Sequence, residues 1–192
     1  MAEIVLFHHA QGLTPGVTAF ADRLRAAGHT VHVPDLFAGH TFGSVAEGVG
    51  HAQEIGMDAV IDRGRAAVED LPAELVYAGF SLGVLPAQAL AQTRPGARGA
   101  LLVEAFVPPS EFGGGWPPGV PVQVHGNDRD EFFAGDGDLA AAQAFVASTP
   151  DAELFVYPGD AHLFSDESLP TYDEEATALL VDRALRLLSR VG

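Results

Sequence analysis

Ser81 lies in a segment that could hold a serine hydroxyl as a nucleophile. It is the centre of Gly79-Phe80-Ser81-Leu82-Gly83, which follows the apolar run Leu75-Val76-Tyr77-Ala78 and precedes an alanine-rich stretch. The pattern predicts a strand, a tight turn and a helix, with glycines giving the chain room beside an exposed hydroxyl. The helix dipole and the free N–H of Leu82 would favour negative charge on an attacked carbonyl oxygen. The segment therefore predicts acyl-transfer chemistry, although a purely structural turn can have the same pattern.

A base and a carboxylate that could activate this serine follow later in the chain. A serine hydroxyl is a weak nucleophile at neutral pH, so a base must accept its proton and a carboxylate must orient that base. His162, in a turn after the last expected strand, is the candidate base. Asp130 is the candidate acid, with Asp128 and then Glu104 as alternatives, because spacing alone cannot separate residues two apart. The chain order of serine, acid and histidine itself favours this interpretation.

Aromatic residues near the expected strand ends could form the walls of a binding site. Phe132 and Phe133 come shortly after Asp130, and Trp116 lies in a loop rich in glycine and proline. Each of these rings is either a pocket wall or part of the core.

Four histidines could be considered as metal ligands: His8, His9, His40 and His51. His8 and His9 end the first expected strand, and adjacent strand residues point to opposite faces, so the two cannot readily share one ion. There is no cysteine, which removes thiolate metal sites, disulfides and a cysteine nucleophile together. We therefore expect no metal and no other cofactor.

Short apolar runs alternate with helical patterns along the chain. Strands are expected at residues 4–7, 30–33, 75–78, 99–103, 120–124 and 154–156, and helices at 15–27, 55–71, 87–93, 139–147 and 172–188. Residues 36–50 are expected to form a loop, and Leu179 is expected on the inward face of the closing helix. This alternation predicts an α/β fold, an open and mainly parallel sheet with helices on both faces, formed by one domain over residues 1–192. Active residues in such sheets gather at the carboxyl ends of the strands.

Composition limits the possible partners. The chain has 192 residues, 47% of them hydrophobic, and a net charge of −16 with arginine as its only basic residue apart from histidine. This charge argues against nucleic acid and acidic membranes, since both bind clustered cations. No apolar run is long enough to span a bilayer, and the N-terminus lacks the basic region of a secretory signal. We expect a cytoplasmic monomer or homodimer with a small-molecule substrate.

Four segments resemble the dienelactone hydrolase family of α/β-hydrolases, and the likeness covers nearly the whole chain. They are Pro34-Asp35-Leu36, Gly79-Phe80-Ser81-Leu82-Gly83, Asp130-Glu131-Phe132-Phe133, and Tyr157-Pro158-Gly159-Asp160-Ala161-His162-Leu163-Phe164 with Ser168-Leu169-Pro170-Thr171-Tyr172-Asp173. The resemblance implies a compact α/β-hydrolase fold. It also implies Ser81, Asp130 and His162 as nucleophile, acid and base, and the N–H of Ala10 as the second oxyanion donor beside Leu82.

The chain departs from the family's namesake enzymes at three positions. They have a cysteine in place of Ser81, a glutamate in place of His9, and a substrate-binding arginine where this chain has Asp166. His9 thus becomes a candidate substrate-binding residue. Asp166 in place of a cation, together with the net charge of −16, predicts a site that repels anions. The resemblance implies hydrolysis of a small neutral ester or lactone through an acyl-serine. The alternative is a non-catalytic protein of this fold that binds a small molecule or a partner.

Overall fold

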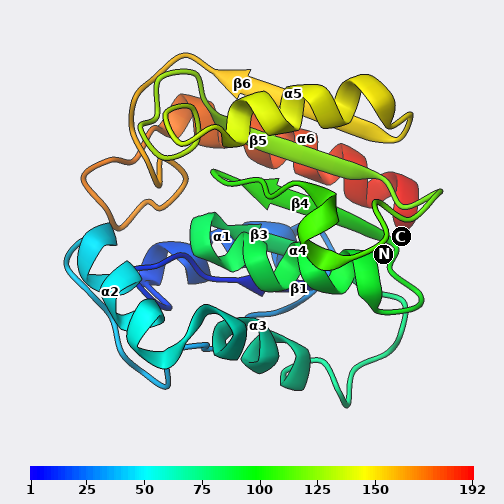
Figure 1. Cartoon of the computed structure of the whole chain (residues 1–192), viewed down its shortest axis with the longest axis horizontal. Coiled ribbons are helices and arrows are strands. Elements are labelled where there is room, and N and C mark those ends of the chain that lie inside the picture. The colour runs from blue at the N-terminus through cyan, green and yellow to red at the C-terminus, as the bar shows by residue number, and fades with distance from the viewer.

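The computed structural model describes residues 1–192 as an open sheet between two layers of helices (Figure 1). The strands are β1 (Glu3–Phe7), β2 (Thr30–His32), β3 (Val76–Phe80), β4 (Gly99–Val103), β5 (Val122–Asn127) and β6 (Ala152–Tyr157). The helices are α1 (Pro15–Ala26), α2 (Val45–Ile55), α3 (Met57–Ala66), α4 (Val84–Thr93), α5 (Asp138–Ser148) and α6 (Glu174–Val191), with short 3₁₀ helices η1 (Ser81–Gly83) and η2 (Pro109–Phe112).

All six strands are parallel, in the order β2-β1-β3-β4-β5-β6. The predicted α/β fold with a parallel sheet is therefore confirmed. The chain moves outward from β1 to β2, then returns across β1 to β3 and continues to the opposite edge. The order thus reverses between β1 and β3, and ligands of open parallel sheets bind at such a reversal, outside the carboxyl ends of the strands. Those ends point toward the left in Figure 1.

Each face of the sheet carries its own core, because alternate strand residues point to opposite faces. In β1, Val5 and Phe7 pack into the core that α2, α3, α4 and α5 cover, whereas Ile4 and Leu6 pack into the core that α1 and α6 cover. Figure 1 shows these two layers in front of and behind the sheet. Strands buried on both faces explain why they appear in the sequence as continuous apolar runs.

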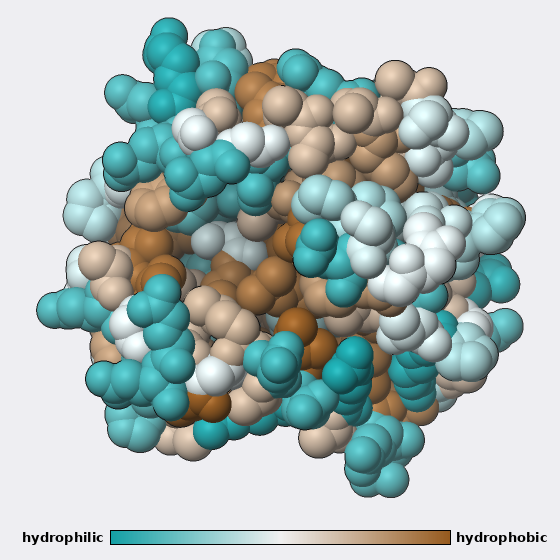
Figure 2. Space-filling model, viewed as in Figure 1, coloured by the Kyte–Doolittle hydropathy of each residue, from teal (hydrophilic) through white to brown (hydrophobic).

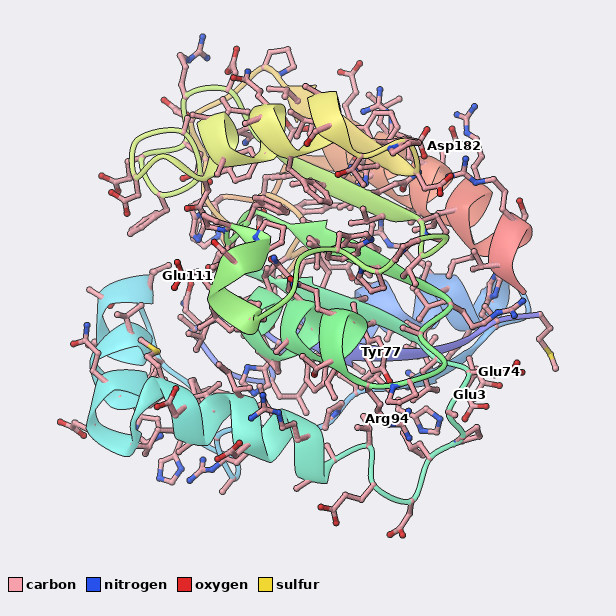
Figure 3. The ribbon with its side chains drawn as sticks, turned by 45° about the vertical axis from the view of Figure 1, so that its right-hand side comes forward. Glu3, Glu74, Tyr77, Arg94, Glu111 and Asp182 are labelled. Atoms are coloured by element: carbon pink, nitrogen blue, oxygen red, sulfur yellow. The ribbon has the colours of Figure 1, made fainter.

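Arg94, the residue after α4, fixes the start of β3. Its guanidinium donates to the carbonyls of Val68, Leu71 and Pro72 at 3.0, 2.8 and 2.9 Å, and to the Tyr77 hydroxyl at 2.9 Å. Arg94 and Tyr77 lie close to each other in Figure 3. The same side chain therefore holds the segment before β3, the strand itself and the end of α4 together.

The predicted loop at residues 36–50 is wrong in its second half, where α2 begins at Val45. The Ser44 hydroxyl accepts from the Glu47 N–H at 3.2 Å, which is the N-terminal signal of a helix. The single helix expected at 55–71 is also wrong. Gly56, at φ +92°, separates α2 from α3, and α3 ends at Ala66.

Leu179 was expected to face the core, but it is 44% exposed. The buried side of α6 runs through Ala176, Leu180, Ala184 and Leu187, and Leu179 lies beside that row. None of the helices combines the length and the apolar character that crossing a membrane requires.

Candidate active site

Ser81 follows the last residue of β3 and begins η1. Its backbone is in the left-handed region, at φ +47°, as expected for a residue held on a tight turn. A Cβ on Gly79 would lie 2.2 Å from the Gly83 carbonyl oxygen, and one on Gly83 would lie 2.5 Å from the Phe7 carbonyl oxygen. The two glycines therefore let β3, the turn and the end of β1 approach one another closely.

Hydrogen bonds connect Ser81 to His162 and His162 to Asp130. The Ser81 Oγ lies 2.8 Å from the His162 Nε2, and the His162 Nδ1–H donates to the Asp130 Oδ2 at 2.6 Å. Asp130 is fully buried, and its other oxygen accepts from the Phe132 N–H at 2.9 Å. The structure thus brings together the three residues expected to be nucleophile, acid and base, at the carboxyl ends of β3, β5 and β6.

Asp128 has a different partner. It is exposed, and its Oδ1 accepts from the Gly159 N–H at 2.9 Å, which ties the loop after β5 to the turn before His162. Of the two aspartates that the sequence left as alternatives, Asp130 is the one that contacts the imidazole.

The charges around His162 favour its protonated form. Burial lowers the pKa of His162, but the hydrogen bond to Asp130 and the negative charges of Glu104, Asp130 and Glu131 more than offset this, so its pKa lies above the ordinary value. An imidazolium at this position would be stabilised, as general-base chemistry requires.

Two backbone N–H groups expected to bind an oxyanion belong to Leu82 and Ala10. Leu82 lies in the first turn after β3, where a backbone N–H has no helical acceptor. Ala10 is buried, and its N–H makes no hydrogen bond within the protein. Ala10 follows the strand end that Gly83 touches, so the β1 loop lies beside the Ser81 turn.

His9, the expected substrate-binding residue, and Asp166 are buried against each other. They are 1% and 3% exposed, and the His9 Nε2 donates to the Asp166 Oδ2 at 2.8 Å. Thr14 and Ser168 also donate to the Asp166 carboxylate, and the His9 Nδ1 accepts from the Gln11 N–H. A pair buried in this way neither contacts a ligand nor places charge at the mouth of the site. It instead joins the loop after β1 to the loop that follows His162.

Of the three aromatic candidates, only Phe132 lies against the triad. Its side chain is 36% exposed, and its ring centroid is 4.6 Å from that of His162. Phe133 is fully buried over Gly126, where a Cβ would come within 2.2 Å of the ring, so Phe133 belongs to the core. In Figure 2 the surface is hollowed toward the side where the strands end, and apolar residues gather there.

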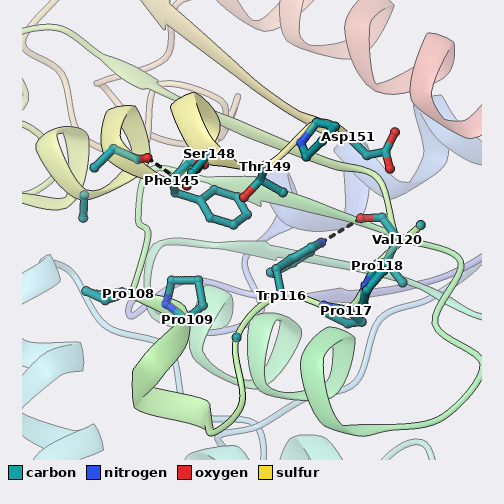
Figure 4. Close-up of a pocket in the computed structure, with 15 residues that line it drawn as sticks. Pro108, Pro109, Trp116, Pro117, Pro118, Val120, Phe145, Ser148, Thr149 and Asp151 are labelled. Atoms are coloured by element: carbon teal, nitrogen blue, oxygen red, sulfur yellow. Dashed lines mark hydrogen bonds between the residues drawn. The ribbon is translucent and has the colours of Figure 1, made fainter.

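Trp116 lines a different cavity, of about 670 Å³, between the β4–β5 connection and α5. Its Nε1–H donates to the Val120 carbonyl at 2.7 Å, and its ring packs against Phe145 (Figure 4). No residue of the triad lines this cavity. Of the two roles considered for Trp116, it has that of a pocket wall, but of this cavity and not of the triad's surroundings, because the connection carries it toward the amino end of β5.

The four histidines considered as metal ligands have other partners or positions. The His8 Nδ1–H donates to the His9 carbonyl at 2.8 Å, and its Nε2 accepts from the Leu36 N–H at 2.9 Å. Burial lowers the pKa of His8 to about 4, which keeps this ring neutral. His40 and His51 pack against each other, with ring centroids 5.4 Å apart. No three side chains of metal-binding type gather as ligands anywhere in the structure.

Comparisons with known proteins identify the family and the fold of the chain. A sequence model described as "Dienelactone hydrolase family" matches residues 1–192. A search of curated proteins found no match.

Three solved structures illustrate the likeness in fold. A dienelactone hydrolase-like promiscuous phosphotriesterase from metagenomic libraries is 19% identical with a TM-score of 0.81, over 100% of this chain and 87% of that one. The alpha/beta hydrolase domain-containing protein 10 from mouse is 14% identical with a TM-score of 0.70, over 99% and 90%. Esterase 2 from Thermogutta terrifontis, phosphorylated by paraoxon, is 18% identical with a TM-score of 0.65, over 100% and 83%.

We predict that Asp166→Asn destabilises the protein by about 2 kcal/mol near neutral pH. Burial raises the pKa of Asp166, but the hydrogen bonds from His9, Ser168 and Thr14 outweigh it and lower the pKa to about 2. Because this lies below the value of about 3.9 in an unfolded chain, the contribution is complete above that value and is lost as the pH falls toward 2.

Urea unfolding near pH 7, and at the lowest pH where the wild type stays folded, measures this difference. Asp160→Asn, an exposed aspartate of the same loop, is the control and should change stability little at either pH. An Asp166→Asn loss that does not shrink on acidification would contradict a stabilising role of the carboxylate charge.

Proposed function

Because the chain belongs to the dienelactone hydrolase family of α/β-hydrolases, we propose that it hydrolyses a small, neutral carboxylic ester or lactone through an acyl-Ser81 intermediate, without a metal ion. The observation that carries this proposal is the unbroken hydrogen-bonded series from the Ser81 hydroxyl through His162 to the buried Asp130. Such a series supplies a nucleophile, a base and an orienting carboxylate, and a protein that only binds ligands has no need of it.

The proposed reaction has two halves. His162 accepts the Ser81 proton at Nε2 as Oγ attacks the ester carbonyl, and the N–H groups of Leu82 and Ala10 bind the resulting oxyanion. The tetrahedral intermediate collapses, the bond to the leaving oxygen breaks, and the imidazolium returns its proton to that oxygen. Water then attacks the acyl-enzyme with His162 again as the base, which releases the acid and restores Ser81.

A serine at this position makes the base more important than it is for a cysteine. A cysteine is partly ionised at neutral pH, whereas a serine hydroxyl is not, so attack by Ser81 depends on His162 at 2.8 Å. Burial of Asp130 and the raised pKa of His162 both suit that role. The similar esterase from Thermogutta terrifontis, described as phosphorylated by paraoxon, gives further support for ester chemistry on this fold.

We predict that Ser81→Ala reduces the turnover of a short-chain ester by about 10⁴-fold or more, and that Asp130→Asn reduces it by about 10³- to 10⁴-fold. Asparagine has no negative charge to stabilise the imidazolium, and its amide can turn an N–H₂ donor toward the His162 Nδ1, so it no longer fixes the histidine tautomer. Asp128→Asn is the matched control, two residues away, and should stay within about twofold of the wild type because Asp128 is exposed and does not touch His162.

Steady-state kinetics of the three variants, each checked by thermal melting, tests the proposal. If Ser81→Ala retained more than about a tenth of the wild-type rate, no acyl-serine would be needed. If Asp128→Asn were the damaging substitution, the orienting carboxylate would be Asp128. If no ester or lactone were hydrolysed by the wild type, a binding role for this site would be favoured.

The charges near the triad support a neutral substrate. Carboxylates from three segments surround His162, namely Glu104 after β4, Asp130 and Glu131 after β5, and Asp138 at the start of α5. The exposed Phe132 ring beside His162 offers an apolar contact instead. A negatively charged substrate would therefore meet repulsion on approach.

We predict that a neutral diester has a kcat/KM about tenfold higher than its half-ester with one free carboxylate, at low salt. Added salt should narrow this difference, because it screens the repulsion. Faster hydrolysis of the half-ester would contradict the neutral-substrate proposal. Loss of that advantage in Arg129→Ala would then identify Arg129, next to the acid, as the group that binds the anion.

A further inference from the structure

Glu104, the residue directly after β4, is held in an unfavourable backbone conformation beside the triad. Its φ is +65°, and its N–H donates to the His125 carbonyl at 2.7 Å. Four residues other than glycine have positive φ, and three of them adjoin the active site: Ser81, Glu104 and Leu163, which follows His162. Such strain persists where the surrounding structure enforces it, and it is concentrated at functional sites.

The Glu104 carboxyl is buried without a hydrogen-bond partner. The residue is 1% exposed, and neither carboxyl oxygen makes a hydrogen bond. Burying a carboxyl group in this way costs stability, and an apolar residue of similar size would avoid that cost. Stability therefore does not explain why this position holds a glutamate.

The charged groups that face Glu104 are those of the triad. They are His162, from the loop after β6, and Asp130, from the loop after β5. The backbone amides of Phe164 and Ser165 approach the carboxyl group closely enough to lower its pKa, although neither makes a regular hydrogen bond to it. Glu131 and Asp138 act on His162 from the β5 loop and from α5. His162 is the single cationic partner in this set, so the charge of Glu104 acts chiefly on the imidazole.

We propose that Glu104 is a positioning residue that acts through His162: its carboxylate form stabilises the imidazolium that arises when Ser81 gives up its proton, and its neutral form does not. The catalytic part of this inference rests on the proposed hydrolysis. Asp130 fixes the tautomer of His162 through a hydrogen bond, whereas Glu104 makes none and contributes charge alone. The two carboxylates thus have separate effects on the same ring.

Glu104 changes its charge near neutral pH. Burial raises the pKa of Glu104 to about 7, with Asp130 acting in the same direction and His162 and the two amides opposing it. The protein would then have a weaker base below neutral pH, where Glu104 is protonated, and a stronger one above it. Because Glu104 and His162 interact, the pKa values observed in a titration describe the two groups together and not either residue alone.

The test is the pKa of His162, followed by NMR of its ring in the wild type and in Glu104→Gln. The His162 signals are assigned by comparison with His162→Gln. Removal of a nearby negative charge should lower the pKa of His162 by about 0.5 to 1 unit. Glu104→Asp keeps the negative charge but moves it farther from His162, so it should give an intermediate pKa. It also provides the test if Glu104→Gln does not fold. Glu131→Gln removes an exposed carboxylate and should shift the pKa by less than about 0.2 unit.

Kinetics on the same variants completes the test. The acid limb of kcat/KM should move to lower pH in Glu104→Gln, together with a loss of about 5- to 10-fold in kcat above pH 8 that nearly disappears near pH 6. An unchanged His162 pKa, a uniform loss at every pH, or an equal shift in Glu131→Gln would overturn the inference. A shifted pKa in a protein that hydrolyses no ester would instead leave the coupling intact and contradict the proposed function.

Discussion

The buried hydrogen bond between the His162 Nδ1 and the Asp130 Oδ2, 2.6 Å long, is the contact on which the rest of the site depends. It joins the loops after β5 and β6 and points the other ring nitrogen at Ser81. A parallel sheet makes this possible, because it brings the carboxyl ends of β3, β5 and β6 to the same edge although 81 residues separate Ser81 from His162. Both oxygens of the buried Asp130 side chain have hydrogen-bond partners, the His162 Nδ1–H and the Phe132 N–H.

A second buried pair keeps the loop that carries the base in place. The His9–Asp166 contact, with Thr14 and Ser168, ties the residues after His162 to the loop that follows β1. That loop also holds Ala10, so the same contact sets the position of a proposed oxyanion donor. His9 and Asp166, two of the three residues that distinguish this chain from the family's namesake enzymes, thus contribute to the framework of the site. The negative charge that acts on His162 comes instead from Asp130, Glu104, Glu131 and Asp138.

Local patterns predicted the six strands and the three triad candidates, because each candidate lies in the turn or loop that follows a strand recognisable in the sequence as an apolar run. Features that depend on side-chain direction were not predictable. Asp128 and Asp130 differ only in which way the loop turns them, and His9 meets a partner 157 residues away. The two adjacent rings, Phe132 and Phe133, likewise point to solvent and to the core. Helix α2 was missed because its glycines dilute the apolar pattern, although Ser44 and Glu47 marked its start.

Reaction with a fluorophosphonate tests the central claim, that Ser81 is a nucleophile activated by His162 and Asp130, without requiring the natural substrate. The Oγ would attack phosphorus, fluoride would leave, and His162 would take the proton. Peptide mass spectrometry should find one adduct per chain, on Ser81, that is absent in Ser81→Ala and forms far more slowly in His162→Ala. Intact, folded protein that gains no adduct, or gains one at another residue, would contradict the account.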